Sequence, residues 1–185
     1  MSVVFTEENH SYKSTDGDEI RWTSTTGVIG KYKQPFDKEF VADKVSKNKK
    51  SKWYGKTPQQ IKNIWNTEAE RAMELGNWYH NQRESDLLEF NTIQRYGKEV
   101  PIVRPIIEGD KKYAPNQKLT EGVYPELLVY LKSAAISGQS DLVEVVDGFV
   151  HITDYKTNKE IKEKSYVNWE GVSKKMNTPV EHLDD

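Results

Sequence analysis

Residues 138–158 of the chain read GQSDLVEVVDGFVHITDYKTN, and this stretch predicts a β-hairpin. Asp147-Gly148 separates two runs of β-forming residues. A tight type I′ turn favours such a pair because both of its central residues need a positive φ. With a two-residue turn the register follows by counting, so Val146 faces Phe149 and the pairing continues outward from there.

The same register gathers charged side chains beyond the apolar part of the hairpin. Asp141 is expected to face Asp154, and the two-residue period of a strand puts Lys156 on the face of Asp154. Directly opposite carboxylates repel each other, and a divalent cation, which prefers carboxylate oxygens, would offset that repulsion. The alternative is a pair of solvated aspartates on a wet sheet face. Apolar residues on the same face predict burial and favour the metal site; they are Val143, Val145, Val150 and Ile152.

The composition predicts one folded, soluble domain. The 185 residues are 35% hydrophobic and 30% charged, which suffices for a sizeable core. The formal net charge of −2 neither favours nor excludes a polyanionic partner, so any nucleic-acid site must come from local basic patches. The chain has no cysteine, which excludes disulfides, thiolate metal sites and a cysteine nucleophile. Neither a signal-peptide pattern nor a membrane-length apolar run is present, so a cytoplasmic location is expected.

Two further candidates for metal ligands stand upstream of the hairpin. His80 lies on a helix predicted from about Thr67 to Phe90, one turn after Gly76, on a stripe of residues spaced by three and four. A lone histidine on such a stripe is more often a satisfied core residue than a ligand. Glu126 lies in a predicted strand over residues 124–131 and shares a face with apolar residues. The stripe is expected to face inward and consists of Ala69, Ala72, Met73, Gly76, His80, Arg83 and Leu87.

Two segments are candidates for contact with nucleic acid. Ser24, Thr25 and Thr26 precede an apolar run and predict a helix N-cap, where backbone N–H groups and hydroxyls can also hold a phosphate. A lysine-rich stretch with aromatic residues follows a predicted helix, and it could bind phosphates and stack on bases or could simply be a solvated loop. The residues concerned there are Lys49, Lys50, Lys52, Trp53 and Tyr54. Just after them, Thr57 and Gln60 around Pro58 predict a capping box that starts a helix.

Four marks now stand in a fixed order along the chain: Gly76-x-x-x-His80, Glu126, Gly138-x-x-Asp141 and Asp154-Tyr155-Lys156-Thr157. Together they resemble the PD-(D/E)XK nuclease superfamily in its RecB-like exonuclease branch, which includes phage exonucleases and the mitochondrial genome maintenance exonuclease. The segment TSTTGVIGKYKQPFD also looks like the start of phage members. The likeness spans most of the chain, and the four marks in order are more specific than the hairpin alone.

The resemblance implies an α/β (α+β) fold, with a restriction-endonuclease-like core in which helices flank a mixed central β-sheet, and a helical N-terminal part. It implies a single nuclease domain over residues 1–185 that hydrolyses DNA phosphodiester bonds with Mg²⁺ or Mn²⁺. The metal set would be His80, Asp141, Asp154 and Tyr155, and Lys156 would be catalytic together with Asp141, Asp154 and Glu126. Oxygen ligands suit either ion, and a histidine favours Mn²⁺.

The chain departs from the RecB-like pattern after the lysine. A helix with a Q-x-x-x-Y motif that contacts DNA usually follows, and none is found before Asp185. The domain is therefore expected to lack its C-terminal helical motif, which a second chain could supply. A phage-type exonuclease in recombination, replication or repair, working in the host cytoplasm, is the favoured function. The alternatives are a non-catalytic or partner-dependent DNA-binding module and a structure-specific endonuclease on the same fold.

Overall fold

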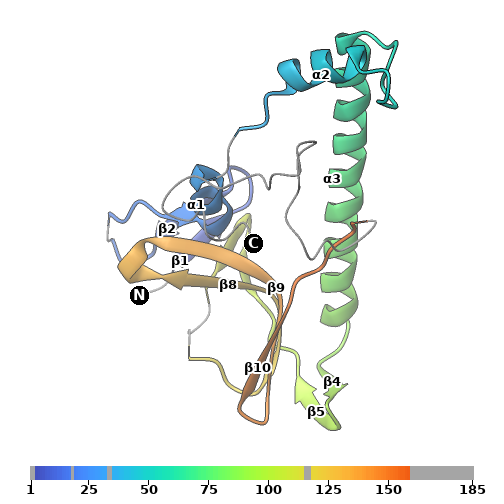
Figure 1. Ribbon diagram of the computed structural model, residues 1–185. Coiled ribbons are helices and arrows are strands. Elements are labelled where there is room, and N and C mark those ends of the chain that lie inside the picture. The colour runs from blue at the N-terminus through green and yellow to red at the C-terminus, as the bar shows by residue number, and fades with distance from the viewer. Residues whose placement is uncertain (1–2, 18, 33–34, 115–117, 159–185) are drawn as a thin grey trace. The chain divides into compact units, whose positions relative to one another are not determined.

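A computed structural model describes residues 3–17, 19–32, 35–114 and 118–158. The chain divides into two units, which are described separately (Figure 1). The first, called the sheet unit, contains Met1–Lys31 and His80–Lys156; the second, called the helical unit, contains Tyr32–Tyr79 and Thr157–Asp185. The protein is thus of mixed α/β, α+β class, as predicted. The single domain predicted for residues 1–185 stays a prediction, and residues 159–185, where the C-terminal motif was sought, lie outside the described residues.

The sheet unit contains an antiparallel sheet in the strand order β2-β1-β7-β6. Its strands are β1 (Val3–Thr6), β2 (Ser11–Ser14), β6 (Ile106–Glu108) and β7 (Lys111–Tyr113). Buried Val3 and Phe5 of β1 pack with Ala114 and with Leu128 from the next sheet. This packing fixes β7 beside the strand that carries Glu126.

The second sheet of this unit is built around β9 (Ile136–Val146), its central strand. Antiparallel β8 (Gly122–Leu131) pairs along one side, after which a short 3₁₀ helix (Lys132–Ala134) leads into β9. On the other side β9 pairs antiparallel with β10 (Phe149–Thr153) and parallel with β3 (Thr23–Ser24). Because it contains both pairing directions, the sheet is mixed.

The predicted hairpin register is confirmed between β9 and β10. Val146 pairs with Phe149, and the ladder continues to Leu142 and Thr153. β10 ends there, one step before Asp154, so the expected pairing of that residue with Asp141 is not formed.

The predicted burial of the whole hairpin face is wrong for β10. Val143 on β9 is buried and packs with Tyr124 and Leu127. Val150 and Ile152 are 57% and 71% exposed. The reason is that β9 lies between paired neighbours, whereas β10 is an edge strand whose apolar side chains meet no core cluster among the described residues.

A second hairpin and the end of a long helix complete the core of the sheet unit. The hairpin consists of β4 (Thr92–Arg95) and β5 (Lys98–Pro101). Val100 of this hairpin packs with Leu87 of the helix and with Leu142 and Val146 of β9. Arg95 also forms an ion pair with Glu144, a carboxylate that is only 5% exposed. These contacts hold the C-terminal turns of the helix against β9.

Helix α1 (Thr25–Tyr32) follows β3 directly. The Gly27 N–H donates to Ser24 Oγ at 3.0 Å, so Ser24 is the predicted N-cap. A close approach explains the glycine at the start of the hairpin, because a Cβ at Gly138 would lie only 3.0 Å from Thr25 Oγ1. Thr25 is thereby placed against β9.

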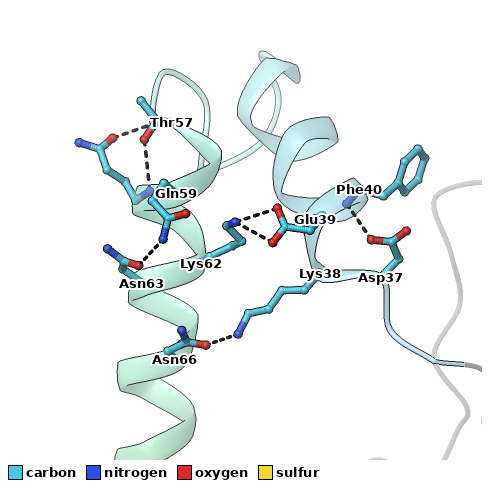
Figure 2. A network of polar contacts seen from close by, with 10 residues as sticks. Asp37, Lys38, Glu39, Phe40, Thr57, Gln59, Lys62, Asn63 and Asn66 are labelled. Carbon is cyan, nitrogen blue, oxygen red and sulfur yellow. Dashed lines mark hydrogen bonds and ion pairs between the residues drawn. The ribbon is translucent and has the colours of Figure 1, made fainter.

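The helical unit contains α2 (Lys38–Lys47) and most of α3 (Pro58–Leu88), whose last turns from His80 onward belong to the sheet unit. Asp37 caps α2 by accepting from the Phe40 N–H at 2.9 Å. Figure 2 shows how Lys62 of α3 reaches the carboxylate of Glu39 on α2, at 2.6 and 2.7 Å. Among the described residues, no helix is both long and apolar enough to cross a membrane.

The helices predicted from Thr57 and from Thr67 are one continuous helix, because no glycine or proline interrupts the chain between them. The predicted buried stripe is wrong over its first half. Ala69 and Ala72 are exposed, and Met73 is 62% exposed. Among the described residues, no core cluster includes a side chain from these turns of α3.

The capping box at the start of α3 is confirmed and gives a first testable prediction. The Gln60 N–H donates to Thr57 Oγ1 at 3.2 Å, and the Thr57 N–H donates to Gln60 Oε1 at 2.9 Å. Thr57→Ala removes the first bond and should lower the free energy of unfolding by about 1 kcal/mol in urea titrations. Thr67→Ala, in the exposed interior of the same helix, should leave stability unchanged or slightly raised. Equal losses from both substitutions would contradict a capping role for Thr57.

Candidate metal centre

Three side chains from different elements meet in the sheet unit. They are His80 from α3, Glu126 from β8 and Asp141 from β9, and one potential ligand atom of each lies within 4.8 Å of the others. His80 Nδ1 is 3.4 Å from Asp141 Oδ1 and 3.9 Å from Glu126 Oε1. The three side chains are only 14–29% exposed, so their polar atoms face one another more than solvent.

The two carboxylates stand opposite each other at a break in the ladder between β8 and β9. Pro125 pairs with Leu142 and Leu127 pairs with Ser140, so Glu126 and Asp141 occupy the register position between these pairs. Glu126 has a φ of +47°, in the left-handed region that a residue with a side chain seldom adopts within a strand. Such strain costs about 1–3 kcal/mol and is concentrated at functional sites. The deformation therefore supports a role for Glu126 beyond folding.

A hydrogen bond to the backbone sets the tautomer of His80. Its Nε2 lies 3.1 Å from the carbonyl oxygen of Tyr155, which can only accept, so Nε2 carries the proton and donates. In the neutral ring Nδ1 is then unprotonated, with its lone pair on the side of Asp141 and Glu126. Metal-binding histidines typically donate their second ring nitrogen to a carbonyl or carboxylate in this way. In this tautomer Nδ1 is the ring nitrogen that could hold a metal ion.

The backbone of Tyr155 bonds both Asp141 and His80. Its N–H donates to Asp141 Oδ2 at 2.5 Å, while its carbonyl accepts from His80. Asp141 Oδ1 is left on the side of His80. Tyr155 was predicted in the metal set, and the structure places its carbonyl against His80 next to the three-residue group.

Asp154 and Lys156 lie outside the three-residue group. Asp154 Oδ2 is 2.6 Å from Lys156 Nζ, and the two side chains are 62% and 53% exposed. The place that the counted register gives to Asp154 beside Asp141 is taken by the Tyr155 N–H. All the predicted roles stay predictions: the metal roles of His80, Asp141, Asp154 and Tyr155, and the catalytic roles of Lys156, Asp141, Asp154 and Glu126.

Comparisons with protein-family models, with curated proteins and with solved structures give no match to this chain.

Burial raises the pKa of Glu126 from its ordinary 4.5 to about 6. The Lys112 ammonium opposes this rise, Glu84 and Asp141 add to it by like-charge repulsion, and His80 lowers the pKa slightly. A carboxyl of this pKa is ionised at neutral pH and protonated in mild acid. Because a metal ligand must be deprotonated, a metal ion at Glu126 would compete with protons below about pH 6.

The raised pKa predicts how the stability of the metal-free protein depends on pH. Between pH 4.5 and 6 the native Glu126 binds more protons than the unfolded one, so its contribution to stability is complete below pH 4.5 and is lost as the pH rises through 6. The loss amounts to about 2 kcal/mol, since one pKa unit corresponds to about 1.4 kcal/mol.

Glu126→Gln, which keeps the shape and removes the charge, tests this pH dependence. In urea unfolding without metal, the variant should gain stability relative to the wild type between pH 4.5 and pH 7.5. Glu89→Gln, at an exposed position after α3, should show no such gain. If the stability difference between Glu126→Gln and the wild type is the same at both pH values, the pKa of Glu126 is not raised.

The predicted DNA-binding residues lie in two places. Ser24, Thr25 and Thr26 are at the start of α1 in the sheet unit, where Ser24 Oγ and Thr26 Oγ1 are 3.2 Å apart. The basic segment lies between α2 and α3 in the helical unit, where the Trp53 ring packs edge-on against Trp65 with centroids 5.9 Å apart. The segment consists of Lys49, Lys50, Lys52, Trp53 and Tyr54.

The aromatic residues of this segment differ in what remains accessible. Trp53 is half-buried, and Lys52 Nζ lies 4.8 Å from its ring centroid. Tyr54 is 52% exposed. Of the two, Tyr54 has the ring that is better placed to stack on a base.

Sequence reasoning missed two charged residues beside the centre. Glu84 lies one turn after His80 on α3, a spacing that was available as a signal. Lys112 on β7 carried no signal, because its contact with α3 joins distant parts of the sequence.

Proposed function

We propose that this protein is a Mg²⁺- or Mn²⁺-dependent deoxyribonuclease of the PD-(D/E)XK superfamily, in its RecB-like branch. The observation that supports it is the meeting of His80, Glu126 and Asp141, with His80 Nδ1 turned toward both carboxylates. They come from a helix and two adjacent strands, in the order in which the family motifs occur. The sheet of β8, β9, β10 and β3 would be the restriction-endonuclease-like core.

The residues fit a hard divalent cation with one nitrogen ligand. His80 Nδ1, Glu126 and Asp141 would hold it, and this donor set suits Mn²⁺ at least as well as Mg²⁺. When bound, such an ion neutralises phosphate oxygens, lowers the pKa of a water and orients that water for in-line attack. The hydrogen bonds of Tyr155 hold His80 and Asp141 in place for this task.

Lys156 would act on the phosphoryl group rather than on the metal. Its ammonium stands on the residues that follow β10, two positions beyond Asp154, whose carboxylate it contacts. An ammonium fixed near the scissile phosphate stabilises the negative charge that develops as the nucleophile attacks, or positions the attacking water. Asp154 would orient Lys156 through their 2.6 Å contact and could move to the metal when DNA binds.

The proposed substrate is DNA, cut from an end, in recombination, replication or repair. The basic segment with Lys49, Lys50 and Lys52, and the hydroxyls at the start of α1, would contact phosphates. The protein would act in the cytoplasm, that of the host if it is phage-encoded. A second chain could supply the C-terminal helical motif.

A second candidate is a non-catalytic or partner-dependent DNA-binding module on the same fold. The observation that favours it is that Asp154, a ligand in the family pattern, is paired with Lys156 and lies outside the three-residue group. A module of this kind would bind DNA without hydrolysing it.

One assay distinguishes these functions. End-labelled linear DNA and closed circular DNA are each incubated with the protein and with Mn²⁺, Mg²⁺ or EDTA. An exonuclease shortens the linear DNA only with a divalent ion and leaves the closed circle intact. Cutting of the closed circle would instead identify an endonuclease. Binding of DNA without any metal-dependent cleavage would favour the non-catalytic module.

A further inference from the structure

Helix α3 presents two polar side chains toward the sheets, one turn apart. His80 faces Asp141 and Glu126, as described above, and Glu84 faces Lys112 on β7, with Glu84 Oε1 3.7 Å from Lys112 Nζ. The side chains of Lys112 and Glu84 are only 16% and 23% exposed. A charged pair removed from water to this degree costs desolvation energy, which is a reason to look for a role beyond folding stability.

Lys112 also lies beside Glu126. The two line the same pocket, together with Tyr113 and Pro125. The ammonium thus lies 3.7 Å from the Glu84 carboxylate on α3 and lines one pocket with Glu126 of β8.

Nucleases that use two metal ions hold them about 3.5–4 Å apart between shared carboxylates. Glu84, Glu126 and Asp141 would provide enough carboxylates for two ions. A lysine among them changes the charge balance. With all three acids ionised and His80 neutral, Lys112 leaves two negative charges, which one divalent cation neutralises.

We propose that Lys112 stands in for a second metal ion, so that the centre takes one divalent cation per chain, held by His80, Glu126 and Asp141. The ammonium compensates Glu84 and the side of Glu126 that the metal does not use. Lys112 is thus a positioning residue that fixes the number of ions. This inference depends on the metal centre of the proposed function.

Counting Mn²⁺ bound to the whole protein tests the inference, by calorimetry and by the loss of the free Mn²⁺ signal in electron paramagnetic resonance. The wild type should bind one ion per chain. Lys112→Met removes the ammonium but keeps much of the apolar stem, and it should bind a second, weaker ion between Glu84 and Glu126. The double variant Lys112→Met with Glu84→Gln should return to one ion. Lys111→Met, the exposed neighbour on the same strand, should behave as the wild type.

The outcomes separate the inference from the proposed function. Two ions bound to the wild type would overturn the role of Lys112 and leave the metal centre intact. One ion bound to a folded Lys112→Met protein would also overturn it. No Mn²⁺ bound to the wild type would contradict the metal centre itself and the inference with it. The number of Mn²⁺ ions bound per wild-type chain tests the inference even if Lys112→Met fails to fold.

Discussion

Replacing Asp141 with alanine should lower the affinity for Mn²⁺ by more than about 100-fold and remove metal-dependent DNA cleavage. Loss of groups that merely orient metal ligands typically costs about 10–100-fold in affinity, and loss of a ligand should cost more. We expect Asp141 both to hold the metal and to be oriented for it, because Oδ1 faces His80 and Oδ2 accepts from the Tyr155 N–H. Calorimetric titration with Mn²⁺ at pH 7.5 measures the effect directly.

Asp141→Asn separates the two tasks of this side chain. The amide oxygen can still accept from Tyr155, but the negative charge is gone, so the fold should be kept while Mn²⁺ affinity falls nearly as far as in Asp141→Ala. Asp86→Ala, which removes a half-buried aspartate on α3 that pairs with Arg83, is the control for removing a carboxylate elsewhere. Wild-type Mn²⁺ affinity in a folded Asp141→Ala protein would show that this carboxylate is not a ligand.

Replacing Lys156 with alanine should reduce the rate of DNA hydrolysis by about 10²–10³-fold, the usual loss when a group that stabilises developing charge is removed. Its Mn²⁺ affinity should change little, because Lys156 contacts Asp154 and lies outside the group formed by His80, Glu126 and Asp141. Single-turnover cleavage of linear DNA at saturating Mn²⁺ measures the rate, and calorimetry measures the affinity.

Lys13→Ala is the control for the loss of a lysine elsewhere in the sheet unit. It removes an exposed lysine of β2 and should change neither the rate of DNA hydrolysis nor the Mn²⁺ affinity. If Lys156→Ala lowers Mn²⁺ affinity as much as it lowers the rate, then Lys156 acts through the metal site. If it cleaves DNA like the wild type, Lys156 is not catalytic.

The pairing of β9 with β10 could be predicted from the sequence, but the point at which β10 ends could not. The Asp147-Gly148 turn fixed the register from Val146 to Leu142, because a two-residue turn allows one alignment. Counting could not show that β10 ends at Thr153, since a strand's end depends on which hydrogen bonds compete there. In this protein the Tyr155 N–H binds Asp141 directly, and Asp154 turns to Lys156.

For helix α3, likewise, the start could be predicted from neighbouring residues, but its burial and its contacts with other elements could not. Its start was predictable because Thr57 and Gln60 bond each other within one turn and Pro58 suits the first helical position. The burial of Met73 was predicted wrongly, because spacing identifies a face but not whether another element covers it. The contact of Glu84 with Lys112 joins residues on separate elements, and no periodic pattern encodes it.

A crystal grown with Mn²⁺ and measured at the manganese absorption edge would decide whether His80, Glu126 and Asp141 form a metal centre. The geometry predicts one anomalous peak per chain, within about 2.0–2.6 Å of His80 Nδ1 and of one oxygen of each carboxylate, the range of hard-cation bonds. No peak at saturating Mn²⁺, or a peak that contacts neither His80 nor Asp141, would contradict the metal centre and the nuclease function proposed from it.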